Sequence, residues 1–215
     1  NAKTRIFMRL HTLYPGSYAC NSYLLTAGKN AVLFDCSAPV EEVRKALLSD
    51  GAALDAIVLT HGHFDHLLTL AEMKEAFPAP VFLMKDDAAF PCDPEKNCAL
   101  SFLGRECRYP EPDRLLSGGE TLSFGGILLK VLHTPGHTPG SCVFLCGDLA
   151  FTGDTLFDGS HGRTDLPGGD FHAMRQSLSV LAGLPDAVTV YPGHGQSAPL
   201  REALLPLSRI LKRTI

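Results

Sequence analysis

A short histidine-rich segment is the first candidate for chemistry in this sequence. Residues 60–66 read THGHFDH, and the candidate ligands within them are His61, His63, Asp65 and His66. Imidazole nitrogens and carboxylate oxygens bind divalent metals such as zinc, so four such groups on one loop can reach two adjacent ions. A lone histidine is more often only hydrogen-bonded or solvated, but the composition gives this cluster a chance frequency of roughly one in a thousand. The segment therefore predicts a metal site.

Three further candidate ligands each follow an apolar stretch and lie in a glycine-containing turn. They are His137 in TPGHTPGS, Asp154 in TGDT and His194 in YPGHG. Glycine allows backbone conformations that other residues avoid, and proline restricts the approach of the chain, so such turns can aim a side chain inward. Each motif is weak alone and gains force from its place downstream of the histidine cluster. We expect all seven side chains to converge on one pocket at a sheet edge.

The elements that must position these residues are strands and helices that alternate along the chain. Turn-forming residues such as Tyr14–Ser17, Gly28–Asn30, Gly125–Gly126 and Gly147–Asp148 separate the apolar stretches. The predicted strands are Ile6–Leu10, Ser22–Thr26, Ala31–Asp35, Ala56–Leu59, Val81–Met84, Leu122–Phe124, Ile127–His133, Cys142–Leu145, Leu149–Thr152 and Val188–Tyr191. The histidine cluster then forms a strand-to-helix loop.

Helical periodicity indicates three helices. The first begins near Pro39, the second spans Leu67–Phe77 and ends before Pro78, and the third follows Asp170, a residue suited to cap a helix. The segment Phe90–Pro112 shows neither the helical nor the strand periodicity of apolar residues. Such a stretch is usually a lid, a partner surface or a mobile insert. No linker divides the chain, so we expect one α/β domain over residues 1–215, with two sheets packed face to face and helices outside.

Composition limits the classes of function. The 215 residues are 45% hydrophobic, enough for a substantial core, and carry a formal net charge of −4. This acidic balance argues against a nucleic-acid partner, because such binding depends on Lys and Arg neutralising phosphates. Basic residues near the C-terminus fit a solvated helix face better than an anion site. They are Arg201, Arg209, Lys212 and Arg213.

Cysteine usage and hydropathy indicate the compartment. The count of seven cysteines is odd, which favours reduced thiols over a disulfide framework. Cys92, Cys98 and Cys107 lack the paired spacing of a structural zinc site, which stays a minor alternative. Without a signal-like segment or an apolar run of membrane-spanning length, we expect a cytoplasmic protein that does not contact a membrane. The sequence leaves the oligomeric state open.

The seven residues and their order resemble the metallo-β-lactamase superfamily over nearly the whole chain. The resemblance implies an α/β fold, the αββα sandwich, in which two mixed sheets are flanked by helices. It also implies that His61, His63 and His137 hold one ion, that Asp65, His66 and His194 hold the other, and that Asp154 bridges them. His63 and Asp154 favour the binuclear hydrolase branch, because other branches carry Glu or Cys at these positions.

The segment from Asp154 to Asp170 resembles the short glyoxalase-II-like hydrolases, which are thioesterases generally associated with hydroxyacylglutathione. Full-length glyoxalase II carries a further C-terminal helical domain that contributes to glutathione binding, whereas this chain ends about twenty residues after His194. The resemblance implies a small-molecule substrate, with a thioester as the expected class, and the identity of its thiol part stays open.

The implied chemistry uses two divalent ions, with zinc expected and iron or manganese as alternatives. Two cations about 3.5–4 Å apart share a water, lower its pKa and present a bridging hydroxide to an acyl carbon. One ion stabilises the oxyanion, and a thiolate leaves with little help from an acid. Asp65 and Asp154 are the expected catalytic carboxylates. Both belong to the ligand set, and Asp65 can also assist proton transfer.

Other activities of the same fold compete with this hypothesis. A persulfide dioxygenase would use only His61, His137 and Asp154 around a single iron, and such relatives share the segment Gly162–Asp165. Lactones and other activated esters are open to the same hydroxide attack. A nuclease is disfavoured by the acidic balance, and a scaffold protein by a complete ligand set that would have no structural use.

Several residues near the candidate site have alternative interpretations. Asp35 either supports a ligand histidine or caps a turn, and Arg163 is expected to pair with Asp165 rather than contact substrate. Four other histidines are placed outside the site, with His161 the nearest to it. These four are His11, His133, His161 and His172.

Overall fold

The computed structural model describes residues 7–13 and 19–211, whose strands form two six-stranded sheets. The first sheet has the spatial order β1 (Met8–Leu13), β2 (Ser22–Ala27), β3 (Asn30–Phe34), β4 (Ala53–Val58), β5 (Val81–Met84) and β6 (Arg114–Leu116). The second has the order β12 (Ala198–Pro199), β11 (Thr189–Pro192), β10 (Leu149–Gly153), β9 (Cys142–Cys146), β8 (Ile127–His133) and β7 (Thr121–Phe124). Both sheets are mixed, because β3–β6 and the pair β10–β11 are parallel and the other pairs are antiparallel.

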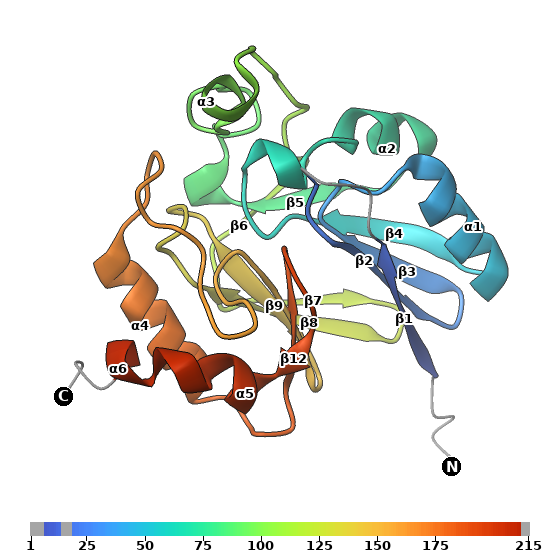
Figure 1. Ribbon diagram of the computed structural model, residues 1–215. Coiled ribbons are helices and arrows are strands. Elements are labelled where there is room, and N and C mark those ends of the chain that lie inside the picture. The colour runs from blue at the N-terminus through green and yellow to red at the C-terminus, as the bar shows by residue number, and fades with distance from the viewer. Residues whose placement is uncertain (1–6, 14–18, 212–215) are drawn as a thin grey trace.

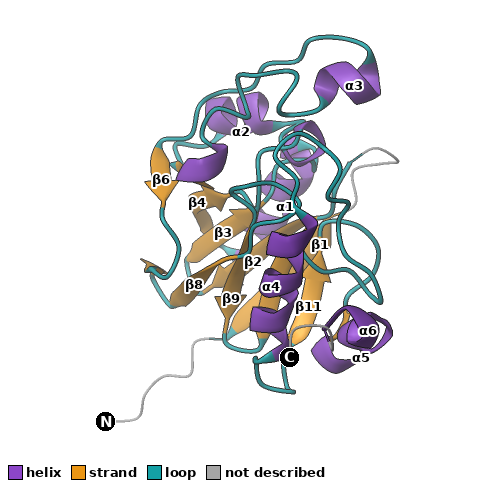
Figure 2. Cartoon of the chain, turned by 90° about the vertical axis from the view of Figure 1, so that its left-hand side faces the viewer, coloured by secondary structure: helices purple, strands orange, loops and turns teal. Residues whose placement is uncertain are grey.

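Helices lie on the outer side of each sheet (Figures 1 and 2). The α-helices are α1 (Val40–Asp50), α2 (Leu70–Ala76), α3 (Ala99–Leu103), α4 (Phe171–Ala182), α5 (Leu200–Leu204) and α6 (Ser208–Leu211). Three short 3₁₀ turns accompany them within the described residues: η1 (Phe64–His66), η2 (Lys85–Asp87) and η3 (Leu205–Leu207). In both figures α3 lies beyond the ends of the sheets. The expected α/β class, with two mixed sheets flanked by helices, is confirmed.

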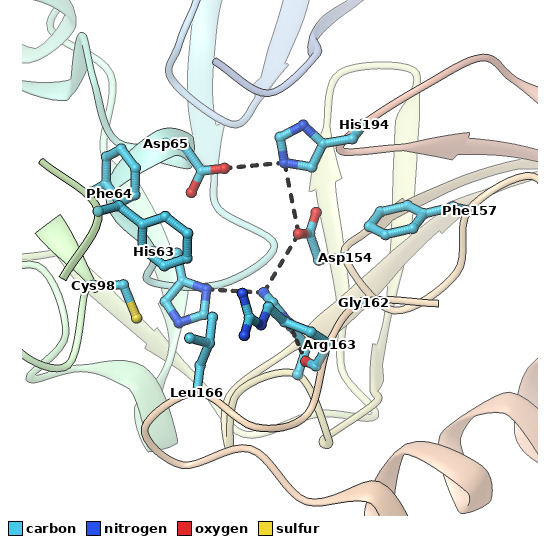
Figure 3. A pocket seen from close by; sticks show the side chains of 12 residues that line it. His63, Phe64, Asp65, Cys98, Asp154, Phe157, Gly162, Arg163, Leu166 and His194 are labelled. Carbon is cyan, nitrogen blue, oxygen red and sulfur yellow. Dashed lines mark hydrogen bonds and ion pairs between the residues drawn. The ribbon is translucent and has the colours of Figure 1, made fainter. Parts of the chain in front are cut away.

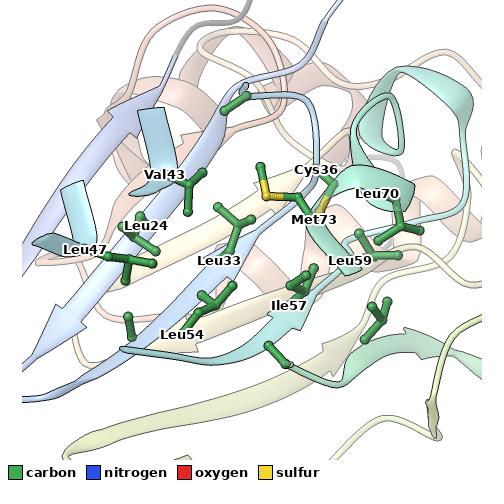
Figure 4. Close-up of a cluster of buried hydrophobic side chains, with 14 of the residues drawn as sticks. Leu24, Leu33, Cys36, Val43, Leu47, Leu54, Ile57, Leu59, Leu70 and Met73 are labelled. Carbon is green, nitrogen blue, oxygen red and sulfur yellow. The ribbon is translucent and has the colours of Figure 1, made fainter. Parts of the chain in front are cut away.

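Alternation of side chains along the strands fills the layers between these elements. Leu25 and Phe34 face the second sheet, where Phe34 stacks on Phe151 with ring centroids 3.6 Å apart. Their neighbours Leu24 and Leu33 face outward into the cluster under α1 and α2 (Figure 4). Successive strand residues point to opposite faces, so one strand contributes to two apolar layers. A third cluster joins the second sheet to α4 and α5.

Most predicted elements are present, with corrected boundaries. The first strand is Met8–Leu13 instead of Ile6–Leu10; Ile6 and the turn Tyr14–Ser17 lie outside the described residues. The helix predicted from Leu67 begins only at Leu70. The residues of the expected first turn are instead hydrogen-bonded to the segment after β3. Cys36 donates its N–H to the carbonyl of His66, and its own carbonyl accepts the N–H of Thr69.

The segment Phe90–Pro112 is not wholly irregular, since it contains the five-residue helix α3. The strand β6 that follows was not predicted, because three residues at a sheet edge are too short for a period. Asp170 caps α4 as expected and accepts the N–H groups of His172 and Ala173. In the C-terminal basic group, Arg201 is exposed and pairs with Asp186, while Lys212 and Arg213 lie outside the described residues.

Among the described residues, none of the helices has both the length and the apolar character needed to cross a membrane. The seven cysteines are free thiols, and five of them are buried. No candidate metal cluster among the described residues combines Cys92, Cys98 and Cys107, so the minor zinc-site alternative gains no support.

Candidate metal centre

Loops at the ends of four strands carry the seven candidate ligands. The segment after β4 contains His61 and His63 and closes with η1, which holds Asp65 and His66. His137 follows β8, Asp154 follows β10 and His194 follows β11. Backbone hydrogen bonds bring these loops together: the one from Cys142 N to Thr60 O connects the two sheets, and the one from Gly193 N to Gly153 O joins two loops of the second sheet.

One group consists of His61, His63 and His137, each of which has a ring nitrogen within 4.8 Å of one on each of the others. The Nδ1 atom of His63 lies 2.9 Å from Nε2 of His137. Nδ1 of His137 lies 2.7 Å from the carbonyl oxygen of Arg163. Because a carbonyl only accepts, Nδ1 of His137 carries the proton and Nε2 presents a lone pair to the site.

A second group consists of Asp65, His66 and His194, again with ligand atoms within 4.8 Å. The Nε2 atom of His194 lies 3.0 Å from a carboxylate oxygen of Asp65. The Nδ1 atom of His66 lies 2.9 Å from Asp35 Oδ2. Asp35 also accepts hydrogen bonds from the backbone N–H and the hydroxyl of Thr60, both at 2.8 Å. Of the two interpretations of Asp35, support of a histidine therefore fits, since it fixes the His66 ring with Nε2 facing the site.

Asp154 lies between the two groups (Figure 3). Its Oδ1 atom is 3.2 Å from Nε2 of His66. Its Oδ2 atom is 3.5 Å from Nε2 of His137 and 3.7 Å from Nε2 of His194. A single carboxylate thus faces side chains of both groups, which is the position that a bridging ligand needs.

Several polar atoms at this centre are buried without a hydrogen-bond partner. In the described part of the chain, the buried side-chain atoms without a partner are His61 Nε2, His63 Nε2, His66 Nε2 and Asp154 Oδ1. Buried polar groups are normally paired, because an unpaired one costs about 1–3 kcal/mol. A divalent ion would satisfy imidazole nitrogens and carboxylate oxygens together, so the donor set fits a metal centre.

Burial and mutual repulsion keep two histidines of the first group, His61 and His63, neutral. Burial, together with the neighbouring His66 and His137, lowers the pKa of His61 well below its ordinary value. Burial and His137 lower the pKa of His63 to about 3. A metal ligand must offer a lone pair, so these uncharged imidazoles are prepared for a cation. Burial raises the pKa of Asp154, but His66 and His137 outweigh burial and the pKa of Asp154 falls below its usual range.

A cavity of about 410 Å³ opens onto this centre. His61 and His66 are buried and do not line it. The other five candidate ligands line it together with Phe64, Cys98, Phe102, Phe157, Gly162, Arg163 and Leu166. The seven side chains therefore converge on one place, as the sequence predicted, and the other residues that line the cavity are mainly apolar.

Residues flanking the cavity test the remaining sequence interpretations. Arg163 pairs with Asp165 through two hydrogen bonds of 2.6 and 2.7 Å, as expected, and its guanidinium lies 5.9 Å from the ring centroid of Phe102. His161 does not line the cavity. Sequence reasoning missed Phe102 as a cavity residue and Asp87 as a buried neighbour of the ligand loops. For Phe102, the unexplained insert Phe90–Pro112 was the available signal.

Comparison with known proteins agrees with this geometry. The family model of the metallo-β-lactamase superfamily matches residues 15–194. The chain belongs to this superfamily. A probable metallo-hydrolase, YqgX of Bacillus subtilis, is 33% identical over 87% of this chain and 90% of its own length. Hydroxyacylglutathione hydrolase GloC of Haemophilus influenzae is 34% identical over 78% of this chain and 81% of its own.

Solved structures of the superfamily have the same fold. The BLEG-1 B3 metallo-β-lactamase superposes with a TM-score of 0.85 at 32% identity, covering 91% of this chain and 96% of the other. ETHE1 from Myxococcus xanthus gives 0.77 at 26% identity, with coverages of 95% and 85%. TTHA1623, solved in a di-iron-bound form, gives 0.76 at 36% identity, with coverages of 88% and 94%. The family and its metallo-hydrolase members support a metal-dependent hydrolase.

Proposed function

We propose that this protein is a binuclear metal-dependent hydrolase of small thioesters. The observation that carries the proposal is the convergence of seven ligand-type side chains, four atoms of which are buried without a partner. A purely structural cluster would leave these atoms unsatisfied at a cost, whereas two divalent ions would use them all.

The two groups of side chains suggest the division of ligands. His61, His63 and His137 would hold one ion, and Asp65, His66 and His194 would hold the other. Asp154, which faces both groups, would bridge them. Imidazole and carboxylate ligands suit zinc, with iron and manganese as alternatives that the same donors accept.

Bound at these positions, two divalent ions would lower the pKa of a shared water and polarise an acyl carbonyl. The protein's own residues complete the site. The Asp65 carboxylate lies at the cavity wall, where it can accept a proton from the attacking water and pass it to the leaving group. Asp35 holds His66 in one orientation, and the Arg163 carbonyl does the same for His137.

The residues that line the cavity favour a thioester substrate whose acyl or thiol group is apolar. Phe64, Phe157 and Leu166 line the cavity beside the candidate ligands. Such a surface favours apolar acyl or thiol groups, by about 25 cal/mol for each Å² of apolar surface removed from water. The similarity to a hydroxyacylglutathione hydrolase supports thioesters over other acyl compounds. A thiolate also leaves readily, so the site needs no acid for it other than Asp65.

Parallel assays on zinc-, manganese- and iron-loaded protein test this function. Thiolate release should be measured with lactoylglutathione and simple acyl thioesters, oxygen uptake with glutathione persulfide, and ring opening with a β-lactam. We expect thioester cleavage that disappears after chelation and returns with metal. Oxygen uptake confined to the iron form, without thioester cleavage under any metal, would instead identify a dioxygenase. β-Lactam cleavage alone would equally contradict the proposal.

A further inference from the structure

Asp87 is a buried carboxylate that the proposed mechanism does not use. It ends the 3₁₀ turn η2, which follows β5 and carries no candidate ligand. Its exposed fraction is 0%. No ion pair with Asp87 exists within the described residues, although burying an uncompensated charge is costly. A carboxylate retained under these conditions calls for a function.

Three hydrogen bonds show what Asp87 holds. Its Oδ2 atom accepts the N–H of Gly62 at 3.0 Å and the hydroxyl of Thr138 at 2.7 Å. Its Oδ1 atom accepts the N–H of Gly140 at 2.6 Å. Gly62 lies between His61 and His63 in the chain, and Thr138 directly follows His137. One carboxylate therefore joins the two loops that supply the first group of histidines.

The surrounding backbone is packed tightly enough to transmit this restraint. A Cβ atom added to Gly140 would lie 2.6 Å from the backbone nitrogen of Asp87, and one added to Gly62 would lie 2.4 Å from Cβ of Phe90. Both positions therefore require glycine. The Phe90 ring in turn lies 6.0 Å from the His63 ring. Residues 85–90 thus form a support against which both ligand loops are fixed.

We propose that Asp87 is a positioning residue that sets the metal affinity of the group His61, His63 and His137. This inference rests on the proposed metal centre. Two loops far apart in sequence must hold three nitrogens in register before a cation arrives, and Asp87 lowers the cost of that ordering. Its negative charge, held beside the loops in a buried environment, also favours a cation over the metal-free state.

The second group of ligands has a different support, which makes the proposal specific. Asp35 holds His66 by a hydrogen bond. Among the described residues, no hydrogen bond joins Asp35 to the Gly62 amide or to the His137 loop. Loss of Asp87 should therefore weaken one metal position and spare the other. A residue needed only for folding would not make this distinction.

The test uses variants that isolate each position. His194→Ala retains the first group, and His63→Ala retains the second. Asp87→Asn is added to each background, with Asp86→Asn as the matched control because Asp86 is the partly exposed neighbour in the same turn. Zn²⁺ affinity is measured by competition with a chromophoric chelator, and Co²⁺ absorption reports the ligand geometry. Asparagine keeps the size but removes the charge, and its amide group would face an N–H donor.

We expect Asp87→Asn to weaken zinc binding about 10–100-fold in the His194→Ala background, the range for lost support of a ligand. In the His63→Ala background the affinity should change less than about threefold, and Asp86→Asn should change neither. Thr138→Val, which removes one hydrogen bond to Asp87, should cause a smaller loss at the first position only. If Asp87→Asn does not fold, Thr138→Val is used in its place.

The outcomes separate this inference from the proposed function. Equal weakening of both metal positions by Asp87→Asn would overturn the role of Asp87. Unchanged zinc affinity at the first position in Asp87→Asn would overturn it as well. If Asp87→Asn does not fold, the same two outcomes are read from Thr138→Val. Two intact zinc positions in the wild type without thioester cleavage would remove the thioesterase assignment and leave the role of Asp87 standing. Absence of zinc binding by the wild type would remove both.

Discussion

Asp154 is the residue through which the two halves of the candidate metal centre are connected. Its two oxygens face His66 on one side and His137 and His194 on the other. Because both groups lie within reach of one carboxylate, its loss should affect both ions. Loss of His66, by contrast, removes a side chain of one group only, since its ring faces Asp65, Asp154 and Asp35.

We predict that Asp154→Ala lowers the metal content from about two equivalents to below about one and reduces kcat at least about a hundredfold. His66→Ala should retain about one equivalent. Elemental analysis of purified variants, combined with thioesterase assays, checks both values. A bridging role would be excluded if Asp154→Ala kept two equivalents and wild-type turnover.

At the residue scale, the convergence of side chains was predictable where chemistry and spacing coincide. The four candidate ligands in THGHFDH lie within six residues, so the sequence itself places them together. Asp87 could not be found in this way. Its neighbours Gly62 and Gly140 are 25 and 53 positions distant, and its role follows from hydrogen bonds that only the packed loops create.

At the scale of elements, the short helix α3 supplies a wall of the cavity. Phe102 on this helix lines the cavity, yet 53% of its surface is exposed. The sequence identified Phe90–Pro112 as a segment needing a function but did not predict its helix, because five residues form little more than one turn and give no periodicity. The preceding Cys98, with φ of 67°, has a conformation that sequence patterns rarely indicate.

We predict that Phe102→Ala raises KM for aromatic or long-chain acyl thioesters and leaves kcat nearly unchanged. Loss of roughly 1–1.5 kcal/mol of apolar contact corresponds to about a five- to tenfold fall in kcat/KM. Acetyl thioesters should respond less. Leu100→Ala is the control, because Leu100 is an exposed residue of the same helix that does not line the cavity. Equal effects of the two variants, or no effect of either, would count against a cavity wall formed by α3.

A second element-scale contact ties α1 to the first sheet. Asp50, the last residue of α1, accepts hydrogen bonds from Thr26 of β2 at 2.7 Å and Arg9 of β1 at 2.5 Å, and lies 2.7 Å from the His11 ring of β1. Burial raises the pKa of Asp50, but these partners outweigh burial and lower the pKa to about 2. In the unfolded chain the pKa is about 3.9. The stabilisation is therefore fully present above about pH 4 and is lost as the pH falls through about 2.

We predict that Asp50→Asn lowers the free energy of unfolding at pH 7 by about 1–3 kcal/mol and flattens its decline between about pH 4 and 2. Metal-free protein should be used, so that titration of the candidate ligands is common to variant and wild type. Urea unfolding at several pH values gives the comparison. Glu41→Gln, at an exposed site in α1, should leave the profile unchanged. A parallel profile for Asp50→Asn would contradict the pKa argument.

At the scale of the whole molecule, the centre depends on the packing of two sheets. The candidate ligands on the first sheet's side are His61, His63, Asp65 and His66, and those on the second sheet's side are His137, Asp154 and His194. The sequence predicted the two sheets and the loop positions, because hydrophobic alternation and turn residues are local signals. It also predicted that the ligand loops meet, but it did not show what brings them together. That follows from contacts such as Cys142 N to Thr60 O and the stacking of Phe34 on Phe151.

A centre with ligands from both sheets should couple metal binding to the stability of the whole fold. We predict that chelation lowers Tm by roughly 10–20 °C, because two ions, each at about a hundred times its Kd, add about 5 kcal/mol for a chain of this size. Calorimetry with and without chelator, and after zinc is restored, measures the shift. In Asp154→Ala the shift should nearly vanish, whereas Leu100→Ala should keep it. If chelation removed the metal from the wild type without changing Tm, the ions would bind the unfolded chain as well as the folded one, and the coupling between sheets and metal would be wrong.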